Sequence, residues 1–360
     1  MGSDADAVRL MQMARAGKKM TSASHAPPDL AEAAVEACRR LLGVEARPAP
    51  ASGPIPKQYK RRQLNSIRLA VGTTTLFATR RRHARYAKHE AAALTTLSRL
   101  GAPVPKLLAG AGEWLIQQDV GRIRLTQKLQ GASQSEGIAL LDSAIDALWR
   151  CQDAGAKAAL GAGLKNLGGY GPLLETPAKL GKILKAPPPI LAAERILPLI
   201  RAPERVFIKW DARPANAIVA ENGAIFWIDW EEWGVRCRLD DLVWLVCDEW
   251  VPFWPEAEDA LIARQIRSRA APFPPETCGA ATYVAAFGTL HLLLRLNVIL
   301  KTKGAAGWWN EEDCHAHELL GVTRNCALRL LSRAAHWASQ VPEFERLAAW
   351  IRTLPEQLPA

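Results

Sequence analysis

The most informative segment of the chain reads Val206-Phe-Ile-Lys-Trp-Asp-Ala-Arg-Pro-Ala-Asn-Ala-Ile-Val-Ala220, and it continues as Glu221-Asn-Gly-Ala-Ile-Phe-Trp-Ile-Asp-Trp230. Two apolar stretches, Ala217–Ala220 and Ala224–Trp227, flank the dipeptide Asn222-Gly223. Asn-Gly favours a two-residue type I′ turn, because both central residues of that turn have positive φ. The segment therefore predicts a β-hairpin with Asn222-Gly223 at its tip.

This hairpin would bring two polar side chains together. With the turn centred on Asn222-Gly223, Asn216 lies directly opposite Asp229, as a non-hydrogen-bonded pair with Cα atoms about 4.5 Å apart. Such a pair shares one face of the ribbon. One amide oxygen and one carboxylate oxygen suit Mg²⁺, which keeps other positions for water and phosphate. Asp211 lies in the loop before the hairpin, which Pro214 rigidifies, so we expect it beside the metal, where it could deprotonate an attacking hydroxyl.

A structural interpretation of the same pattern stays open, because an Asn-Gly hairpin with a polar pair at its base is common. The flanking sequence favours a site instead. The apolar run Ile225-Phe-Trp-Ile228 ends abruptly at Asp229-Trp-Glu-Glu232. A carboxylate at the end of a buried strand needs a partner or a metal.

The segment resembles the aminoglycoside phosphotransferase and choline kinase-like family. The family's catalytic loop reads roughly His-x-Asp-x-x-x-x-Asn and its metal segment reads Ile-Asp-Trp-Glu. The matching segments here are Lys209-Trp-Asp211 through Asn216, and Ile228-Asp-Trp-Glu231. Downstream, Asp241 is similar to the family's Asp that braces the catalytic loop. Upstream, His89–Leu94 is similar to the family's N-lobe helix, and Leu100–Leu107 is similar to its Pro-x-Pro passage. Trp114–Gly121 resembles the strand that enters the hinge.

The resemblance covers about residues 45 to 250 and implies a fold and an activity. The fold is α+β and two-lobed, protein kinase-like, with a small antiparallel-sheet N-lobe and a mainly helical C-lobe. The activity is transfer of the ATP γ-phosphoryl group to a hydroxyl of a small molecule of the aminoglycoside, amino alcohol or sugar type. Asp211 would be the catalytic base, and Asn216 and Asp229 would hold Mg²⁺. Adenine would bind backbone groups of the hinge at Gln118 and Val120.

Two positions depart from the family pattern. Lys209 replaces the family's His, which is mainly structural, and it could reach a phosphate, face solvent or pair with an Asp. No lysine follows the strand Thr73–Thr79, where the family has its ATP-anchoring lysine. Arg80 is the expected substitute, paired with Glu90, although a solvated basic turn is the alternative. These departures keep a catalytically weak pseudokinase or nucleotide-binding scaffold as an alternative function.

The acceptor is not determined by the sequence. Among several tryptophans between 210 and 254, Trp230 and Trp233 lie closest to the metal carboxylate, so with Glu231 they are candidate substrate contacts. Core packing is the alternative for most of these rings. The acidic residues nearby are Glu231, Glu232, Asp248 and Glu249. They would suit a cationic acceptor, or they could be surface charges or ion-pair partners. A basic small lobe would instead favour an anionic glycolipid, as in a lipopolysaccharide-core sugar kinase.

Composition and charge limit the remaining classes. The chain has 360 residues, 49% of them hydrophobic, and a formal net charge of +10. Nine basic residues fall between Lys57 and Arg85, but no RNA-binding motif accompanies them, so we expect them to attract triphosphate or an anionic substrate and not nucleic acid. The seven cysteines are scattered, which indicates reduced thiols and a cytoplasmic protein. The sequence is silent on oligomeric state.

Several short motifs have weaker interpretations. Ala51–Lys57 is the candidate nucleotide-covering loop, although its prolines remove backbone donors. Gly161–Gly171 lacks the ending of a P-loop and is expected to link helices. Cys314-His-Ala-His317 indicates a helix start more than a metal site, because its two histidines would not share a helix face.

Pattern changes divide the chain into a loose segment 1–28, an N-lobe 29–130 and a helical C-lobe 131–360. The N-lobe would begin with a helix over 29–42. Met1–Pro28 has no apolar core typical of a signal peptide. Leu290–Leu300 is too short and too polar to span a bilayer and is expected to be a buried helix. Further helices are expected over 136–152, 256–269, 280–300 and 311–339.

Overall fold

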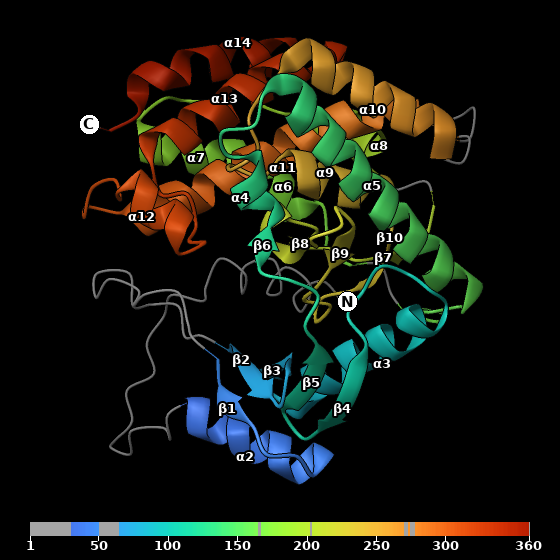
Figure 1. Cartoon of the computed structure of the whole chain (residues 1–360). Coiled ribbons are helices and arrows are strands. Elements are labelled where there is room, and N and C mark those ends of the chain that lie inside the picture. The colour runs from blue at the N-terminus through green and yellow to red at the C-terminus, as the bar shows by residue number, and fades with distance from the viewer. Residues whose placement is uncertain are drawn as a thin grey trace.

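The computed structural model of the chain describes residues 30–49, 65–164, 167–201, 204–269, 273 and 278–359. A small antiparallel sheet forms the N-terminal part, and helices form most of the C-terminal part (Figure 1). This arrangement confirms the predicted α+β, protein kinase-like fold. The loose segment 1–28 and the loop Ala51–Lys57 lie outside the described residues.

The N-terminal sheet has the strand order β1-β2-β3-β5-β4, and every neighbouring pair is antiparallel. Its strands are β1 (Arg47–Pro48), β2 (Ser66–Val71), β3 (Thr74–Arg80), β4 (Leu107–Ala111) and β5 (Trp114–Gln118). Helix α2 (Leu30–Leu42) lies on the side of the sheet that faces away from the helical part (Figure 1). Its Ala34 and Cys38 pack with Leu76 and Ala78 of β3 in a small separate core, so the helix predicted over 29–42 is confirmed.

Helix α3 (Ala84–Arg99) follows β3 and joins the two parts of the molecule. Its Leu94 and Leu97 are fully buried and belong to the large core of the C-terminal part. The same helix contacts β4 of the sheet and α5 (Gln134–Lys157). Glu90 lies on the buried side of α3. This helix therefore places the carboxylate of Glu90 in the protein interior.

The C-terminal part combines short strands with long helices. Strand β8 (Ala217–Val219) pairs with β9 (Ile225–Trp227) and with β6 (Ile123–Arg124), and β7 (Val206–Ile208) pairs with β10 (Gly234–Arg236). Its shorter helices are α4 (Leu125–Leu129), α6 (Gly171–Leu174), α7 (Thr176–Leu184), α8 (Ala193–Ile200), α9 (Leu239–Val246) and α12 (Glu311–Ala316). Its longer helices are α5, α10 (Pro255–Arg269), α11 (Ala280–Lys303), α13 (Arg324–Ala338) and α14 (Glu345–Thr353). In the part of the chain that the structure describes, the short 3-10 turns are η2 (Pro214–Asn216), η3 (Pro342–Phe344) and η4 (Leu354–Gln357).

The single helix predicted over 311–339 was wrong. The chain leaves α12 at Ala316, takes a left-handed backbone at Glu318 with φ 52°, and starts α13 at Arg324. Each helix has its own N-cap, since Asn310 and Thr323 accept from Asp313 N and Cys326 N. Two caps define two helix starts, which the apolar pattern alone did not separate. The expected link at 161–171 is formed by turns and bends up to α6, with residues 165 and 166 not described.

Helix α11 has the length and apolar composition of a membrane span, yet 83% of its most apolar window is buried inside the protein. It packs against α13, α7, α8 and α9. The buried helix predicted at Leu290–Leu300 is therefore confirmed as part of the C-terminal core.

The contact between α11 and α13 depends on a glycine. A Cβ atom built on Gly288 would lie 2.0 Å from Cζ3 of Trp337, and Trp337 is fully buried. We expect Gly288→Ala to lower the free energy of unfolding by about 1–3 kcal/mol through overpacking. Urea unfolding measures this, with Gly169→Ala as the control because nothing lies within 4 Å of its Cβ position. Equal stability of the two variants would contradict the packing argument.

Candidate active site

The predicted hairpin is present, but its register differs by one residue. Ala217 pairs with Trp227 and Val219 with Ile225, and Asn216 O accepts from Ile228 N at 2.9 Å. Asn216 therefore faces Ile228, so the expected cross-strand pair of Asn216 with Asp229 was wrong. The cause is the turn, in which Ala220 N bonds to Ala224 O and only Gly223 has a positive φ, of 80°. This is a three-residue loop with glycine in the left-handed position, and the expected turn had two residues.

Asn216 and Asp229 nevertheless both lie beside Asp211. The Asn216 Nδ2 atom donates to Asp211 Oδ2 at 2.9 Å and to Asp211 O at 3.0 Å. Asp229 follows the end of β9 with a left-handed φ of 60°, and its charge is close enough to raise the pKa of Asp211. Asp229 is joined to the loop by the bond from Lys209 Nζ to Asp229 O at 2.7 Å, and not by cross-strand pairing with Asn216.

The catalytic loop is held by a buried carboxylate. Asp241, which is fully buried at the start of α9, accepts from Lys209 N and Trp210 N, each at 2.8 Å. Gln152 of α5 donates to the same carboxylate at 2.9 Å. The loop needs this support because Trp210 and Asp211 both have positive φ, of 57° and 29°, which is strained backbone for side-chain-bearing residues. Asp241 occupies the bracing position that the sequence predicts for it.

Lys209 is a buried structural residue, and its expected contact with phosphate was wrong. Its exposed fraction is 1%, and its Nζ donates to Asp229 O at 2.7 Å. The ammonium also lies 5.3 Å from the ring centroid of Trp230, a cation–π contact. Lys209 therefore connects the predicted catalytic loop to the backbone of Asp229. The sequence had suggested a phosphate contact, a solvent-facing side chain or a pair with an Asp side chain, and a bond to a backbone oxygen is none of these.

Arg81, and not Arg80, is the basic residue that pairs with Glu90. Arg81 Nε bonds Glu90 Oε2 at 2.5 Å, and Arg81 Nη2 bonds Asp229 Oδ1 at 2.7 Å. A third carboxylate, that of Glu231, lies 3.4 Å from Arg81 Nη1. Arg80 instead forms an exposed pair with Glu113 at 3.1 Å. The guanidinium of Arg81 thus connects the end of β3, helix α3 and the segment after β9.

The electrostatics of this cluster are those of a crowded acidic site. Burial raises the pKa of Asp211, the nearby Arg213 and Lys209 charges oppose that effect, and Asp229 adds to it. Burial and the neighbouring Asp229 raise the pKa of Glu231 to about 7, against the attraction of Arg81. Carboxylates held together in this way favour a cation or a shared proton.

The residues present fit a kinase-type magnesium site. Because the amide nitrogen of Asn216 is bonded to Asp211, its amide oxygen is the atom left to bind a cation, and the carboxylate of Asp229 retains a 33% exposed side chain. Oxygen atoms of this kind are the ligands that Mg²⁺ prefers. Within the described ranges, no group of three or more His, Cys, Asp or Glu is placed to hold a metal, so Cys314-His-Ala-His317 does not form one there.

Two of the expected substrate contacts are core residues. Trp230 has an exposed fraction of 0%, stacks on Phe207 and donates through Nε1 to Trp227 O. Trp233 is also buried, and its ring stacks on His89 at 4.1 Å and donates to His89 O. Both expectations were wrong, because the ring of Trp230 packs against β7 and β9 and the ring of Trp233 packs against α3. Glu231 stays near the cluster through its contact with Arg81.

The expected hinge is the chain between β5 and β6. Gln118 is exposed at the end of β5, where its N–H bonds Lys106 O at 2.9 Å. Asp119 follows and pairs with Arg68 of β2. Val120 is half-buried.

The acidic residues expected to attract a cationic acceptor are already paired. Asp248 Oδ2 accepts from Arg213 Nε at 2.6 Å, and Glu249 accepts from both Arg213 and Arg295. Asp248 and Glu249 are buried. No sequence motif pointed to Arg213 or to Arg295 of α11; the available signal was the Asp248-Glu249 pair, since two adjacent buried acids need basic partners.

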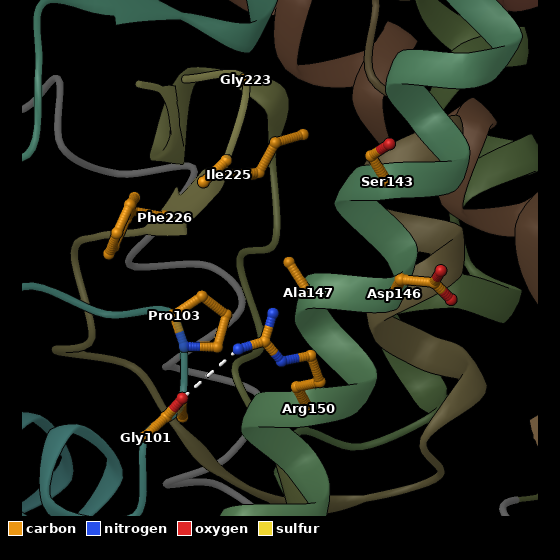
Figure 2. A pocket seen from close by; sticks show the side chains of 11 residues that line it. Gly101, Pro103, Ser143, Asp146, Ala147, Arg150, Gly223, Ile225 and Phe226 are labelled. Carbon is orange, nitrogen blue, oxygen red and sulfur yellow. Dashed lines mark hydrogen bonds between the residues drawn. The ribbon is translucent and has the colours of Figure 1, made fainter. Parts of the chain in front are cut away.

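A cavity of about 390 Å³ lies away from this cluster. Figure 2 shows it between α5, which carries Ser143, Asp146 and Arg150, and the tip of the β8–β9 hairpin at Gly223 and Ile225. Arg150 closes one side by donating to Gly101 O at 3.4 Å. None of the catalytic-loop residues lines it.

Comparisons with known proteins show the family to which the chain belongs. Residues 57–274 match the model of the family described as "Phosphotransferase enzyme family". No curated protein sequence matches the chain. Similar solved structures include a candidate aminoglycoside phosphotransferase from Ralstonia eutropha, with a TM-score of 0.52, 16% identity, and coverage of 84% of this chain and 98% of the other. The AMP-bound spectinomycin phosphotransferase has a TM-score of 0.51 and 10% identity, with coverage of 91% and 99%. The choline kinase of Streptococcus pneumoniae has a TM-score of 0.46 and 13% identity, with coverage of 84% and 98%.

The pairing of Glu249 predicts how stability depends on pH. Burial alone would raise the pKa of Glu249, but the guanidiniums of Arg295 and Arg213 lower it to about 2 from its ordinary 4.5. The folded-state pKa is thus below the unfolded one, so the stabilisation is complete above pH 4.5 and is lost as the pH falls toward 2. Between pH 5 and pH 3 we expect the wild type to lose about 2 kcal/mol more stability than Glu249→Gln. Urea unfolding at both pH values tests this, and equal losses would contradict it.

Proposed function

Because the chain belongs to the phosphotransferase enzyme family, we propose that it transfers the γ-phosphoryl group of ATP to a hydroxyl of a small molecule, with Mg²⁺. The observation that carries the proposal is the convergence of Asp211, Asn216 and Asp229, with Arg81 linking Asp229 to Glu90. Phosphoryl transfer requires mainly positioning and charge neutralisation, and this cluster supplies groups for both.

Asp211 is the proposed catalytic base. Its Oδ2 is fixed by the amide of Asn216, which leaves the other carboxylate oxygen to accept the proton of the acceptor hydroxyl. The raised pKa of Asp211 increases its strength as a base relative to an exposed carboxylate. Asn216 thus has two proposed roles, orienting the base through its nitrogen and holding the metal through its oxygen.

Arg81 is the proposed phosphate anchor, in place of the lysine that the family pattern leads us to expect. Its guanidinium is 7% exposed and is aimed by Glu90, which is fully buried. A guanidinium can bind phosphate oxygens through two parallel hydrogen bonds. Arg81 therefore supplies the positive charge that the family's lysine would provide. Loss of that charge would have favoured the pseudokinase alternative.

Asn216 and Asp229 would hold Mg²⁺, which when bound would neutralise charge on the transferred phosphoryl group. In this arrangement Asp229 has two cationic partners, Arg81 on one oxygen and the metal. Backbone groups near Gln118 and Val120 would receive adenine, as the AMP-bound spectinomycin phosphotransferase is itself a nucleotide complex of this fold.

The remaining expectations also stay proposals. We place the protein in the cytoplasm, since all seven of its cysteines lie in described positions and are free thiols. A small-molecule acceptor is the proposed partner, and no nucleic acid is required by the activity.

Asp229→Ala tests the metal assignment. Removing the carboxylate should lower magnesium-dependent ATP turnover at least about 100-fold, which is typical when one group that stabilises the transition state is lost. Glu221→Ala, at the exposed hairpin tip, is the control and should keep wild-type turnover. Unchanged turnover in Asp229→Ala, with the fold checked by thermal unfolding, would remove the assignment.

Arg81 and Arg80 offer a matched pair for the phosphate anchor. We expect Arg81→Lys to weaken ATP binding about 10-fold, because an ammonium cannot serve Glu90, Asp229 and phosphate with a planar fork. Arg80→Lys should leave ATP binding unchanged, since among the described residues the Arg80 side chain pairs with Glu113 and not with Glu90 or Asp229. Calorimetric titration with ATP and Mg²⁺ measures both.

The scaffold alternative has its own outcome in the same titration. Tight nucleotide binding without turnover on any sugar, amino alcohol or aminoglycoside would favour a nucleotide-binding scaffold over a kinase. Absence of nucleotide binding by the wild type would overturn the proposed function itself.

A further inference from the structure

The charges around the catalytic base are arranged in two layers. The carboxylates of Asp248 and Glu249 form the inner layer, with side chains 1% and 0% exposed. The guanidiniums of Arg213 and Arg295 form the outer layer, with side chains 22% and 12% exposed. A molecule that approaches from solvent therefore meets arginine and not carboxylate.

Each guanidinium of the outer layer has hydrogen-bonding capacity left over. Arg213 uses Nε on Asp248 and Nη2 on Glu249, and Arg295 uses Nε and Nη2 on Glu249. Among the residues that the structure describes, neither Nη1 atom has a hydrogen-bond partner. The acids thus hold the two side chains in fixed positions without using all of their donors, which is how an anion-binding pair is preorganised.

This basic pair adjoins Asp211. The Arg213 backbone N–H donates to Asp211 O at 2.9 Å, and the guanidiniums of Arg213 and Arg295 share the carboxylate of Glu249. Burial lowers the pKa of the His291 imidazole to about 3, and the charges of Arg295 and Arg213 act in the same direction. The nearby Arg124, 24% exposed and paired with Glu318 at 3.2 Å, adds a further guanidinium.

The direction of phosphoryl transfer relates this pair to the acceptor. The attacking and leaving oxygens lie roughly in line across the transferred group. On the proposed function, the nucleotide and metal occupy the side of Asp229 and Arg81, so the acceptor hydroxyl comes to Asp211 from the other side. Arg213 is joined to Asp211 through its backbone N–H, and Arg213 and Arg295 form their ion pairs with Asp248 and Glu249, apart from the Arg81–Asp229 pair, so the acceptor is assigned to these two guanidiniums.

We propose that the acceptor is anionic: a hydroxylated small molecule with a carboxylate or phosphate group that binds Arg213 and Arg295 while its hydroxyl reaches Asp211. This proposal rests on the proposed function and deepens it. It replaces the cationic acceptor expected from Glu231, Glu232, Asp248 and Glu249, because Asp248 and Glu249 are paired with the arginines in front of them and Glu231 is paired with Arg81.

A matched acceptor panel with the full-length protein tests the proposal. D-glucose, D-gluconate, D-glucose 6-phosphate and D-glucosamine form one set, and glycerol, glycerate, glycerol 3-phosphate and ethanolamine form another. ADP release under saturating ATP and Mg²⁺ should give a kcat/KM at least about 10-fold higher for an anionic member than for its neutral and cationic counterparts, a difference of about 1.4 kcal/mol. The carboxylate and phosphate arms show which anion is bound. Preference for a neutral or cationic member, or no turnover of any anionic member, would overturn the proposal.

Paired variants assign the effect to the arginine. The double variant Arg295→Gln/Glu249→Gln removes one buried positive and one buried negative charge together, which avoids an unpaired buried ion. It should raise the KM of the preferred anionic acceptor at least about 10-fold while the KM of ATP changes little. Arg295→Lys, which keeps the charge, should recover part of the affinity. The control is Arg264→Gln/Asp142→Asn, a surface pair 2.7 Å apart, which should behave as wild type.

The two proposals fail in different ways. Calorimetry shows whether each protein binds ATP and Mg²⁺, and thermal unfolding shows whether it is folded. If the wild-type protein does not bind ATP and Mg²⁺, the result counts against the kinase assignment. Intact nucleotide turnover with an unchanged acceptor KM in the Arg295→Gln/Glu249→Gln variant counts only against the anionic acceptor.

Discussion

The buried carboxylate of Asp241 is the constraint on which the site depends. Its two oxygens accept from consecutive backbone N–H groups of Lys209 and Trp210, and those groups precede two residues in left-handed conformations. Without an acceptor, the buried N–H groups would cost free energy and the loop would relax from its strained shape. The position of Asp211, and through it of Asn216, therefore follows from a residue more than 25 positions further along the chain.

Much of the fold follows from the sequence, because turn residues, caps and apolar spacing are local signals. The leading helix α2 and the buried helix α11 are examples. The hairpin shows the limit of such signals. Asn-Gly permits both a two-residue turn and a three-residue loop with glycine in the left-handed position, and the choice moved the register by one residue. Asp229 still lies next to the loop because Lys209 Nζ bonds its backbone oxygen, a contact made outside the strand pairing.

The choice between Arg80 and Arg81 was available from alternation along β3. Leu76 and Ala78 face the small core under α2, and successive side chains of a strand point to opposite faces. By this alternation Arg80 belongs to the same face of the sheet as Leu76 and Ala78, and it pairs with Glu113. The next residue, Arg81, belongs to the opposite face and pairs with Glu90. The roles of Trp230, Trp233 and Lys209 were not available in this way. Their burial comes from contacts between α3, β7 and the segment after β9, which are distant in sequence.

On the proposed function, arginine at position 81 also changes the chemical reactivity of the region that would bind phosphate. A lysine in that position presents a primary amine beside the bound nucleotide, and an amine can be acylated by an electrophilic nucleotide analogue, whereas a guanidinium that stays protonated is a poor nucleophile. The nearby amine of Lys209 is 1% exposed and bonded to Asp229 O. A reagent that labels kinases through an amine at this position would therefore not react with Arg81. The protein nevertheless keeps a positive charge at the same position.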